Sequence, residues 1–265
     1  MRYFRYAAPK SKELTLYPFV CWHVGAQQAR YDFIDEMLYR LKHDENGRWI
    51  YLGDGGECVT KSSKGMIYEQ TMNPQEQFNW LVSKLHPIRS KGLFGVKGNH
   101  GYRTFKESGL GFDESLMLAL QLPYLGTSAF VRLVVQRSAY DLYFHHGLDS
   151  SSNFGGKINK AKAFENWINA DAIFSAHSHI CCEIPPRYMA EIVDSGAQGD
   201  NRIKWKPMSE YICGCAYDSR TGYAEDKGYS PILPAHLTVT FEGRIHEGYP
   251  QKSQTCTIYR PKEIK

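Results

Sequence analysis

The stretch LTLYPFVCW, residues 14–22, is apolar and rich in strand-forming residues, and it leads into His23 and Gly25. A short apolar run that is bounded by a glycine predicts a buried strand. This strand would carry Cys21 and His23 at its carboxyl end, where a thiol and an imidazole can bind a divalent metal ion. Residues 26–41 then carry apolar side chains at helical spacing, so the sequence predicts a strand followed by a helix.

This alternation of strand and helix continues along the chain. Asn73-Pro74 marks the start of another helix, because asparagine suits the N-cap and proline the first turn. After Cys182 strands and loops dominate, and HLTVTF at 236–241, followed by Glu242-Gly243, predicts a hairpin. The sequence contains no repeat and no linker, so it predicts an α/β protein with a single domain, residues 1–265. The remaining predicted elements are strands at 49–52, 92–97, 129–135, 140–144 and 172–175, and helices at 114–122 and 160–168.

Composition and charge limit the functions that the chain can have. Hydrophobic residues make up 42% and charged residues 23% of the 265 residues, as is typical of a soluble globular protein. The net charge of +4 suits an anionic substrate but is too small to establish a nucleic-acid partner. The 7 cysteines are irregularly spaced, which favours a reducing, cytoplasmic location over a disulfide framework. No apolar run reaches membrane-spanning length and no signal-peptide core is present, so we expect no membrane partner.

Five segments concentrate metal-binding side chains at the ends of predicted strands. Six of the ten histidines lie in these segments, although the segments are a small part of the chain. Histidines that served only the core would be spread more evenly. Because open α/β sheets bring the carboxyl ends of their strands together, the segments predict one shared metal site. They are Cys21-Trp22-His23, Gly53-Asp54-Gly55-Gly56-Glu57, Gly98-Asn99-His100, His145-His146-Gly147 and Ala176-His177-Ser178-His179.

The order and the residue types of these segments resemble the calcineurin-like metallophosphoesterase family. The Cys-x-His of the first segment and the Ala-His-x-His of the last are also similar to those of the RNA lariat debranching enzymes, a branch of the same superfamily. The resemblance implies an α/β/β/α sandwich with two central mixed sheets flanked by helices. It also implies hydrolysis of a phosphoester at a dinuclear metal centre at the edge of the sheets.

The resemblance implies that each of the five segments supplies at least one metal ligand. Asp54 would bridge the two metals, and His177 and His179 would each bind a different one. His146 is preferred over its neighbour His145, because the family pattern is an apolar strand followed by His-Gly. The implied ligands are Cys21, His23, Asp54, Asn99, His146, His177 and His179.

The chain departs from the family pattern at two positions. Cys21 stands where the family has an aspartate, and a thiolate there would favour zinc or iron over magnesium. The expected cofactors are two divalent metal ions, manganese, zinc or iron in preference to magnesium. Alternatively, Cys21 is a buried strand residue and one metal site is weak or empty. Gly101 stands where the family has an acidic residue beside the histidine of the third segment. Another acid would then have to orient His100.

His100 and Asp54 are the residues on which catalysis would depend. By resemblance, His100 contacts the scissile phosphate and protonates the leaving oxygen. Arg103 would contact the substrate phosphate or else remain a solvated arginine. Glu57, which closes the second segment, would support the site or remain a surface acid.

The expected substrate is a phosphodiester in a nucleotide or nucleic acid, which makes the protein a phosphodiesterase or nuclease. The mild positive charge, two basic segments and the debranching-enzyme resemblance favour this class. A phosphomonoesterase is the main alternative, and a metal-binding protein of the same fold without catalysis is another. The basic segments are Lys157, Lys160 and Lys162, and Arg202, Lys204 and Lys206 with Trp205 between them. Ordinary solvated or edge-strand roles are the alternative for both.

Overall fold

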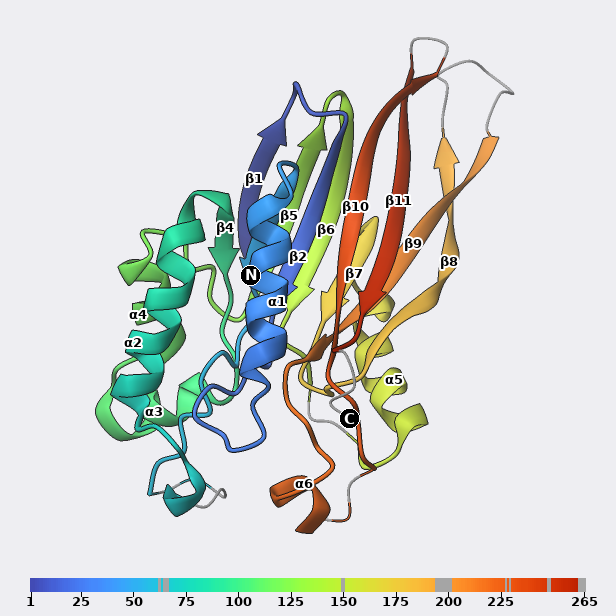
Figure 1. Cartoon of the computed structure of the whole chain (residues 1–265). Helices are drawn as coiled ribbons and strands as arrows, with labels where there is room; N and C mark the ends of the chain where they lie inside the picture. Colours follow the sequence, from blue (N-terminus) through green and yellow to red (C-terminus); the bar gives the residue numbers. More distant parts are fainter. Residues whose placement is uncertain are drawn as a thin grey trace.

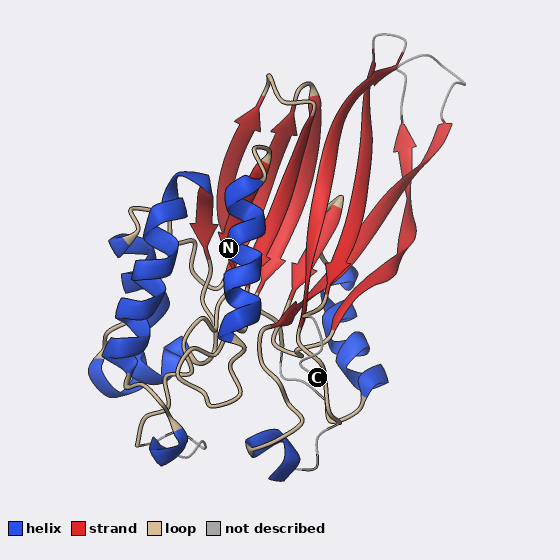
Figure 2. Ribbon diagram, viewed as in Figure 1, coloured by secondary structure: helices blue, strands red, loops and turns tan. Residues whose placement is uncertain are grey.

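The computed structural model describes residues 1–61, 63, 67–148, 151–193, 202–226, 228, 230–246 and 249–261. Within these ranges, eleven strands form a continuous path of pairing, and helices lie on both sides of it (Figures 1 and 2). The path consists of two sheets, which are joined where β9 meets β10 through the pairs Cys215–Ala235 and Gly214–His236. The chain is therefore a mixed α/β protein, as the sequence predicted.

The first sheet has parallel and antiparallel pairs. β1 pairs parallel with β5, β5 pairs antiparallel with β6, and β6, β7 and β9 run parallel to one another. β8 closes this sheet by pairing antiparallel with β9. The six strands are β1 (Arg2–Ala8), β5 (Ser128–Val135), β6 (Ser138–His145), β7 (Ala172–Ser175), β9 (Arg202–Cys215) and β8 (Cys181–Val193).

The second sheet is also mixed. β2, β3 and β4 run parallel, and β10 pairs antiparallel with both β2 and β11. Its strands are β2 (Glu13–Phe19), β3 (Gly47–Tyr51), β4 (Gly92–Gly95), β10 (Ala235–His246) and β11 (Tyr249–Tyr259). Strands within a parallel set end at the same edge of their sheet, so the polar residues that follow them are brought together.

The two sheets pack face to face around the largest apolar core. The ring of Phe94 in β4 lies 5.3 Å from that of Phe4 in β1 and 5.3 Å from that of Phe144 in β6, so side chains of both sheets interdigitate. Phe241 in β10 contacts the ring of Tyr140 in β6 at 4.9 Å. All five are aromatic side chains that contribute large apolar areas to the core.

Helices cover the outer faces of both sheets (Figure 1). The outer face of the second sheet packs its buried Trp49 and Tyr51 against α1 (Tyr31–His43), α2 (Pro74–Leu85) and α4 (Phe112–Ala119). On the first sheet, Tyr143 contacts Phe164 of the 3₁₀ helix Lys162–Asn166, and α5 (Phe154–Ala161) packs nearby. The layers are helix, sheet, sheet and helix, which confirms the predicted sandwich. The other helical segments are α3 (Gly101–Ser108), α6 (Tyr223–Asp226) and the 3₁₀ turns Ile67–Glu69 and His86–Lys91.

Two predicted elements are displaced. The helix expected at 160–168 instead begins at Phe154, because the Asn153 side chain accepts a hydrogen bond from the Gly156 backbone N–H and caps the helix there. The hairpin expected after residues 236–241 is confirmed as β10 and β11, but its turn does not lie at Glu242-Gly243, because β10 continues to His246 and pairs Gly243 with Lys252. Gly243 serves a close approach instead, since a Cβ there would lie 2.5 Å from the carbonyl oxygen of Val135.

Candidate metal centre

The five segments meet at one end of the sandwich, where each follows the carboxyl end of a strand. They follow β2, β3, β4, β6 and β7, in that order along the chain. Backbone hydrogen bonds continue the pairing into the loops, with Cys21 N–H donating to Gly53 O at 3.1 Å and Ala176 N–H donating to His146 O at 2.9 Å. In Figure 1, loops and short helices gather at this end, below the strands.

The backbone is strained where the candidate ligands lie. Among the described residues that are not glycine, eight have a positive φ, and five of them are candidate ligands. A non-glycine residue in this region carries a steric cost of about 1–3 kcal/mol, and such residues cluster at functional sites. Because this strain lowers stability, its concentration in these loops indicates a functional site. The five are Cys21 (φ 49°), His23 (50°), Asp54 (56°), His177 (65°) and His179 (63°).

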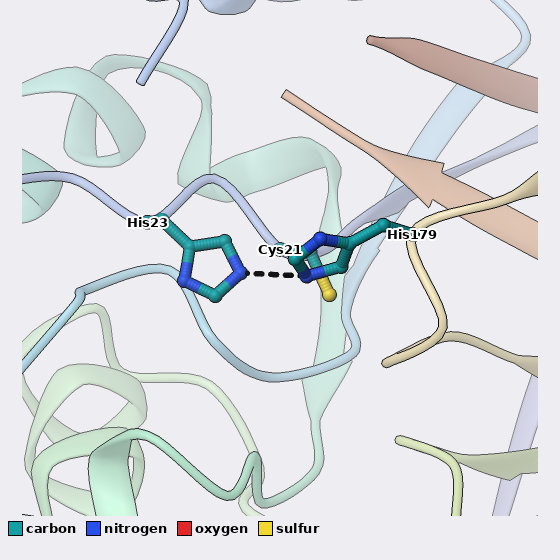
Figure 3. A group of neighbouring side chains, drawn as sticks. All are labelled: Cys21, His23 and His179. Atoms are coloured by element: carbon teal, nitrogen blue, oxygen red, sulfur yellow. Dashed lines mark hydrogen bonds between the residues drawn. The ribbon is translucent and has the colours of Figure 1, made fainter. Parts of the chain in front are cut away.

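The first group of ligand atoms contains two imidazoles and a thiol (Figure 3). His23 Nδ1 donates to Glu57 Oε2 at 2.8 Å, so the Nε2 of the neutral ring has a lone pair. This Nε2 lies 3.0 Å from His179 Nε2, with Cys21 beside both rings. Burial is the main cause that lowers the pKa of both His23 and His179, so both rings are neutral. Neutral rings held this way are the form that binds a divalent metal.

The second group contains an imidazole and two oxygens. His146 Nδ1 donates to the carbonyl oxygen of Leu52 at 2.7 Å, so in the neutral ring Nε2 has the lone pair. That Nε2 lies 2.9 Å from Asp54 Oδ2 and 3.0 Å from Asn99 Oδ1. Burial disfavours the charged form of His146, but the adjacent Asp54 outweighs it and raises the pKa of the ring. A proton on Nε2 or a bound cation would satisfy the two oxygens that face this nitrogen. Within the part of the chain that is described, no hydrogen-bond donor reaches the buried Asp54 Oδ2.

Asp54 lies between the two groups. Its ligand atoms lie within 4.8 Å of those of His23 and His100 on one side, and of those of Cys21 and His146 on the other. Its second oxygen, Oδ1, accepts the backbone N–H of His100 at 2.8 Å. Burial opposes ionisation of Asp54, but His146 and His100, whose own pKa values are raised, outweigh it and hold the pKa of the carboxyl well below its usual value. Asp54 is therefore a buried carboxylate that both groups could share.

Two glycines let the loops of Asp54 and Asn99 approach each other. Gly53 has a φ of 92°, and a Cβ there would lie 2.5 Å from Gly98 Cα and 2.8 Å from His146 Nδ1. A Cβ at Gly98 would overlap Asp54 Oδ1. Any side chain at either position would separate the two loops.

Cys21 is fully buried, and its sulfur belongs to both groups. It lies within 4.8 Å of the ligand atoms of His23 and His179, and also of those of Asp54 and His146. Burial raises the pKa of the thiol well above its usual value, and the charge of Asp54 adds to this. In the absence of a cation Cys21 is therefore a neutral thiol, whereas binding to a metal would deprotonate it.

Glu57 is the acid that orients His100, the role that the sequence left without a named residue. His100 Nδ1 lies 3.2 Å from Glu57 Oε2 and 3.1 Å from Glu57 O. Burial disfavours the charged form of His100, but Glu57 and Asp54 outweigh it and raise the pKa. Arg103 donates from Nη1 to Glu57 Oε1 at 3.1 Å, and its Nη2 lies 3.2 Å from His100 Nε2. Arg103 is thus part of the centre and not a solvated arginine.

The two adjacent histidines of the fourth segment have different surroundings. His146 faces Asp54, whereas the ring of His145 packs on Phe164 with 4.7 Å between ring centres. Burial lowers the pKa of His145 to about 4, and its Nδ1 accepts the backbone N–H of Gly147 at 2.8 Å. The ring of His177 lies 5.4 Å from that of His146. The candidate residues of all five segments therefore lie close together, whereas the ring of His145 packs away from Asp54.

Sequence reasoning missed two residues near the centre and undervalued Glu57. Tyr217 lies beside it, with its ring 5.3 Å from that of His23 and 5.6 Å from that of His179. Asp113 is buried and accepts the backbone N–H of Gly98 at 2.9 Å. Neither lies in a recognisable motif, and Asp113 resembles an ordinary acid in the first turn of a helix. Glu57 could have been weighted more, because it shares a segment with Asp54.

Three lysines of the two basic segments are engaged within the protein, whereas Lys160, Lys204 and Trp205 are exposed. Lys157 donates to the carbonyl oxygen of Ser178 at 3.1 Å, and Lys206 donates to Asn169 Oδ1 at 3.0 Å. Lys162 lies 3.9 Å from the buried Glu165. The side chain of Arg202 lies outside the described residues. None of the described helices is long and apolar enough to cross a membrane.

Comparison with known proteins gives only distant likenesses. No protein-family model and no curated protein matches this chain. Vacuolar protein sorting 29 from Cryptosporidium parvum aligns with a TM-score of 0.41 and 11% identity, over 94% of this chain and 99% of that one. A serine/threonine phosphatase from Saccharomyces cerevisiae with similarity to human phosphatase PP5 aligns with a TM-score of 0.39 and 11% identity, over 99% of this chain and 84% of that one. At alignments this weak, the function has to be inferred from the chain's own residues.

Proposed function

We propose that the chain is a metal-dependent phosphoester hydrolase with a centre for two divalent cations. One observation carries this: two groups of candidate ligand atoms converge on the buried Asp54 carboxylate. Its Oδ2 lies 2.9 Å from His146 Nε2 and makes no hydrogen bond among the described residues. The proton of His23 is directed away to Glu57 and that of His146 to Leu52, as in imidazoles that bind metals. An ordinary polar network would instead pair donors with acceptors.

The donor set suits divalent cations. Cys21, His23 and His179 would hold one cation and Asn99, His146 and His177 the other, with Asp54 shared. When bound, two such cations polarise the phosphate and lower the pKa of the attacking water. We propose that Cys21 is a ligand and not only a core residue, because its sulfur lies within 4.8 Å of ligand atoms of both groups. A thiolate favours zinc or iron over magnesium, and the oxygen ligands Asp54 and Asn99 also suit manganese.

His100 and Arg103 complete the proposed site. A guanidinium forms charge-assisted hydrogen bonds to phosphate oxygens, so Arg103 would hold the substrate beside His100. Burial disfavours the charged form of His100, but Glu57 and Asp54 outweigh it and raise the pKa, which favours the protonated ring. As the P–O bond breaks, that proton passes to the oxygen of the departing alcohol. Glu57 keeps the ring oriented through the transfer.

The substrate that we propose is a phosphodiester of a nucleotide or nucleic acid. The net charge of +4 and the Cys-x-His likeness to the debranching enzymes support it. The basic segments add little support, because Lys157, Lys162 and Lys206 are engaged by neighbouring protein groups. Phosphomonoester hydrolysis is the alternative, with the same ligands and a smaller substrate.

Hydrolysis of two model esters tests the proposal. Metal-free protein is reloaded with manganese, zinc, iron or magnesium and assayed with bis-(p-nitrophenyl) phosphate and with p-nitrophenyl phosphate. We expect metal-dependent cleavage of the diester, highest with manganese, zinc or iron. Cleavage of the monoester alone would show a phosphomonoesterase. Cleavage of neither, with metal bound, would show a metal-binding protein without this activity and would overturn the proposal.

A further inference from the structure

Asp113 is a buried carboxylate that belongs to none of the ligand groups. It lies in the first turn of α4 and is 2% exposed. Its side chain does not cap its own helix, whose N-cap residue is Gly111 and has no side-chain cap. The carboxylate instead accepts hydrogen bonds from groups outside the helix, from Tyr51 Oη at 2.6 Å and from the backbone N–H of Gly98 at 2.9 Å.

These two hydrogen bonds reach the two loops that bear the second group of acceptors. Gly98 directly precedes Asn99 in the loop after β4. Tyr51 Oη in turn accepts the backbone N–H of Gly55, next to Asp54, at 2.9 Å. One carboxylate thereby fixes the end of β4 directly and the turn after β3 through a single phenol. The two bonds use different oxygens of the carboxylate, Oδ1 for Tyr51 and Oδ2 for Gly98.

The space for this carboxylate is provided by Gly101, the residue after His100. A Cβ at Gly101 would lie 2.5 Å from Asp113 Oδ2 and 2.8 Å from its Cγ. Contacts this short do not occur, so a side chain at position 101 would displace Asp113. The absence of a side chain beside His100 and the presence of the carboxylate from α4 are therefore two parts of one arrangement.

We propose that Asp113 is a positioning residue, which holds the loops of Asp54 and Asn99 at the spacing that the second cation requires. The inference rests on the proposed function only in that the centre binds metal. Ligands have to be held within about 0.5 Å of their productive positions, and the residues behind them provide this. Asp113 acts through Gly98, Tyr51 and Gly55, and touches no candidate ligand side chain in the described contacts.

The test compares Asp113→Asn with Glu114→Gln, its exposed neighbour on the same helix. Metal-free protein is titrated with Zn²⁺ by calorimetry. We expect Asp113→Asn to weaken the binding of one Zn²⁺ by about 10–100-fold and to leave the other within about threefold, because an amide cannot accept both hydrogen bonds. Glu114→Gln is expected to bind like the wild type. Urea unfolding of the metal-free variants, with a chelator present, measures their stability. A general loss of stability would weaken both Zn²⁺ sites and not one of them.

Two further variants keep the test decisive if Asp113→Asn does not fold. Tyr51→Phe removes one hydroxyl and is expected to weaken the same Zn²⁺ site. Gly101→Ala places a methyl group against Asp113 and is expected to do likewise, although it alters no ligand. Unchanged Zn²⁺ affinity at both sites in these folded variants would overturn the inference. Zinc binding by a wild-type protein that hydrolyses no ester would overturn only the proposed function.

Discussion

The tautomers of His23 and His146 are set by their neighbours, and they decide what the centre can bind. Each ring donates one N–H to an oxygen that can only accept, Glu57 Oε2 at 2.8 Å and Leu52 O at 2.7 Å. The remaining nitrogen of each ring therefore presents a lone pair to the other acceptors. A single proton could satisfy one group at a time, whereas a divalent cation satisfies several acceptors at once. The positions of these nitrogen and oxygen atoms therefore favour a metal centre at this place.

Replacing each of the adjacent histidines by asparagine gives a matched pair of variants. His146→Asn removes the Nε2 that faces Asp54, so we expect metal affinity to fall by about 100-fold or more. His145→Asn keeps an acceptor near the position of the Nδ1 that bonds Gly147, and the ring lies outside the centre. It should bind metal like the wild type in the same calorimetric titration. Equal losses in both variants would mean that His146 has no special part in the centre.

His236 makes stability depend on pH. Its ring lies between Phe33 and Tyr259, no partner among the described residues reaches Nε2, and burial lowers the pKa to about 3. The unfolded chain binds a proton near pH 6.5, so this site destabilises the fold progressively as the pH falls from about 6.5 towards 3. His236→Phe should remove that loss.

The measurement for His236 is urea unfolding of both proteins at pH 7 and pH 5. Relative to the wild type, His236→Phe should gain roughly 2 kcal/mol in the free energy of unfolding on going from pH 7 to pH 5. His43→Phe, on the surface of α1, is the control and should show no such gain. A parallel pH dependence of the wild type and His236→Phe would contradict the assignment.

At the scale of elements, the ends of strands were predicted better than the starts of helices. β7 occupies Ala172–Ser175, as its apolar run and the histidines after it indicate. The apolar face of α1 was also visible, but the helix begins only at Tyr31, because Ala26 and Ala29 form bridges to Gln70 and Tyr217. Such bridges join residues far apart in the sequence, so local spacing carries no trace of them.

The start of α2 is one helix end that the sequence did predict. Asn73 accepts the N–H groups of Gln75 and Glu76, and the Glu76 side chain returns a hydrogen bond to Asn73 N–H, which forms a capping box. Asn73→Ala should lower the free energy of unfolding by about 1 kcal/mol in urea titration. Asn79→Ala, at an exposed position within the same helix, should change it little or raise it slightly. A larger loss from Asn79→Ala would contradict this view of the helix.

For the candidate site, the sequence showed which residues meet but not how they are held. The ligand residues could be named because they follow strands whose carboxyl ends share an edge. The part played by Glu57 could not be read from its segment, since it depends on three contacts, with His23, His100 and Arg103. The role of Asp113 could not be predicted either, because its hydrogen-bond partners Tyr51 and Gly98 lie on other elements.

At the scale of the whole molecule, the centre is built from both sheets. Cys21, Asp54 and Asn99 follow strands of the second sheet, whereas His146 and His179 follow strands of the first. The two sheets are joined by backbone pairing at the pairs Gly214–His236 and Cys215–Ala235. A metal held by ligands from both sheets would therefore tie together the two halves of the sandwich.

Metal binding should consequently stabilise the whole fold. A ligand that binds only the folded chain adds about 2.7 kcal/mol at a free concentration of 100 times its Kd. For a chain of this size, that corresponds to a rise in Tm of roughly 5–10 °C over the metal-free protein. Differential scanning fluorimetry with added Zn²⁺ or Mn²⁺ measures it, with Asp54→Asn as the control that should show little rise. An equal rise in that variant would place the metal elsewhere.

The central claim is that the shared carboxylate of Asp54 makes this end of the sandwich a metal-dependent phosphoesterase. The most direct measurement is kcat/KM for bis-(p-nitrophenyl) phosphate as metal is titrated into metal-free protein, for the wild type and Asp54→Asn. We predict turnover that rises with metal and saturates in the wild type, and a loss of about 100-fold or more in Asp54→Asn. Full turnover in Asp54→Asn, or turnover in the wild type that is independent of metal, would contradict the claim.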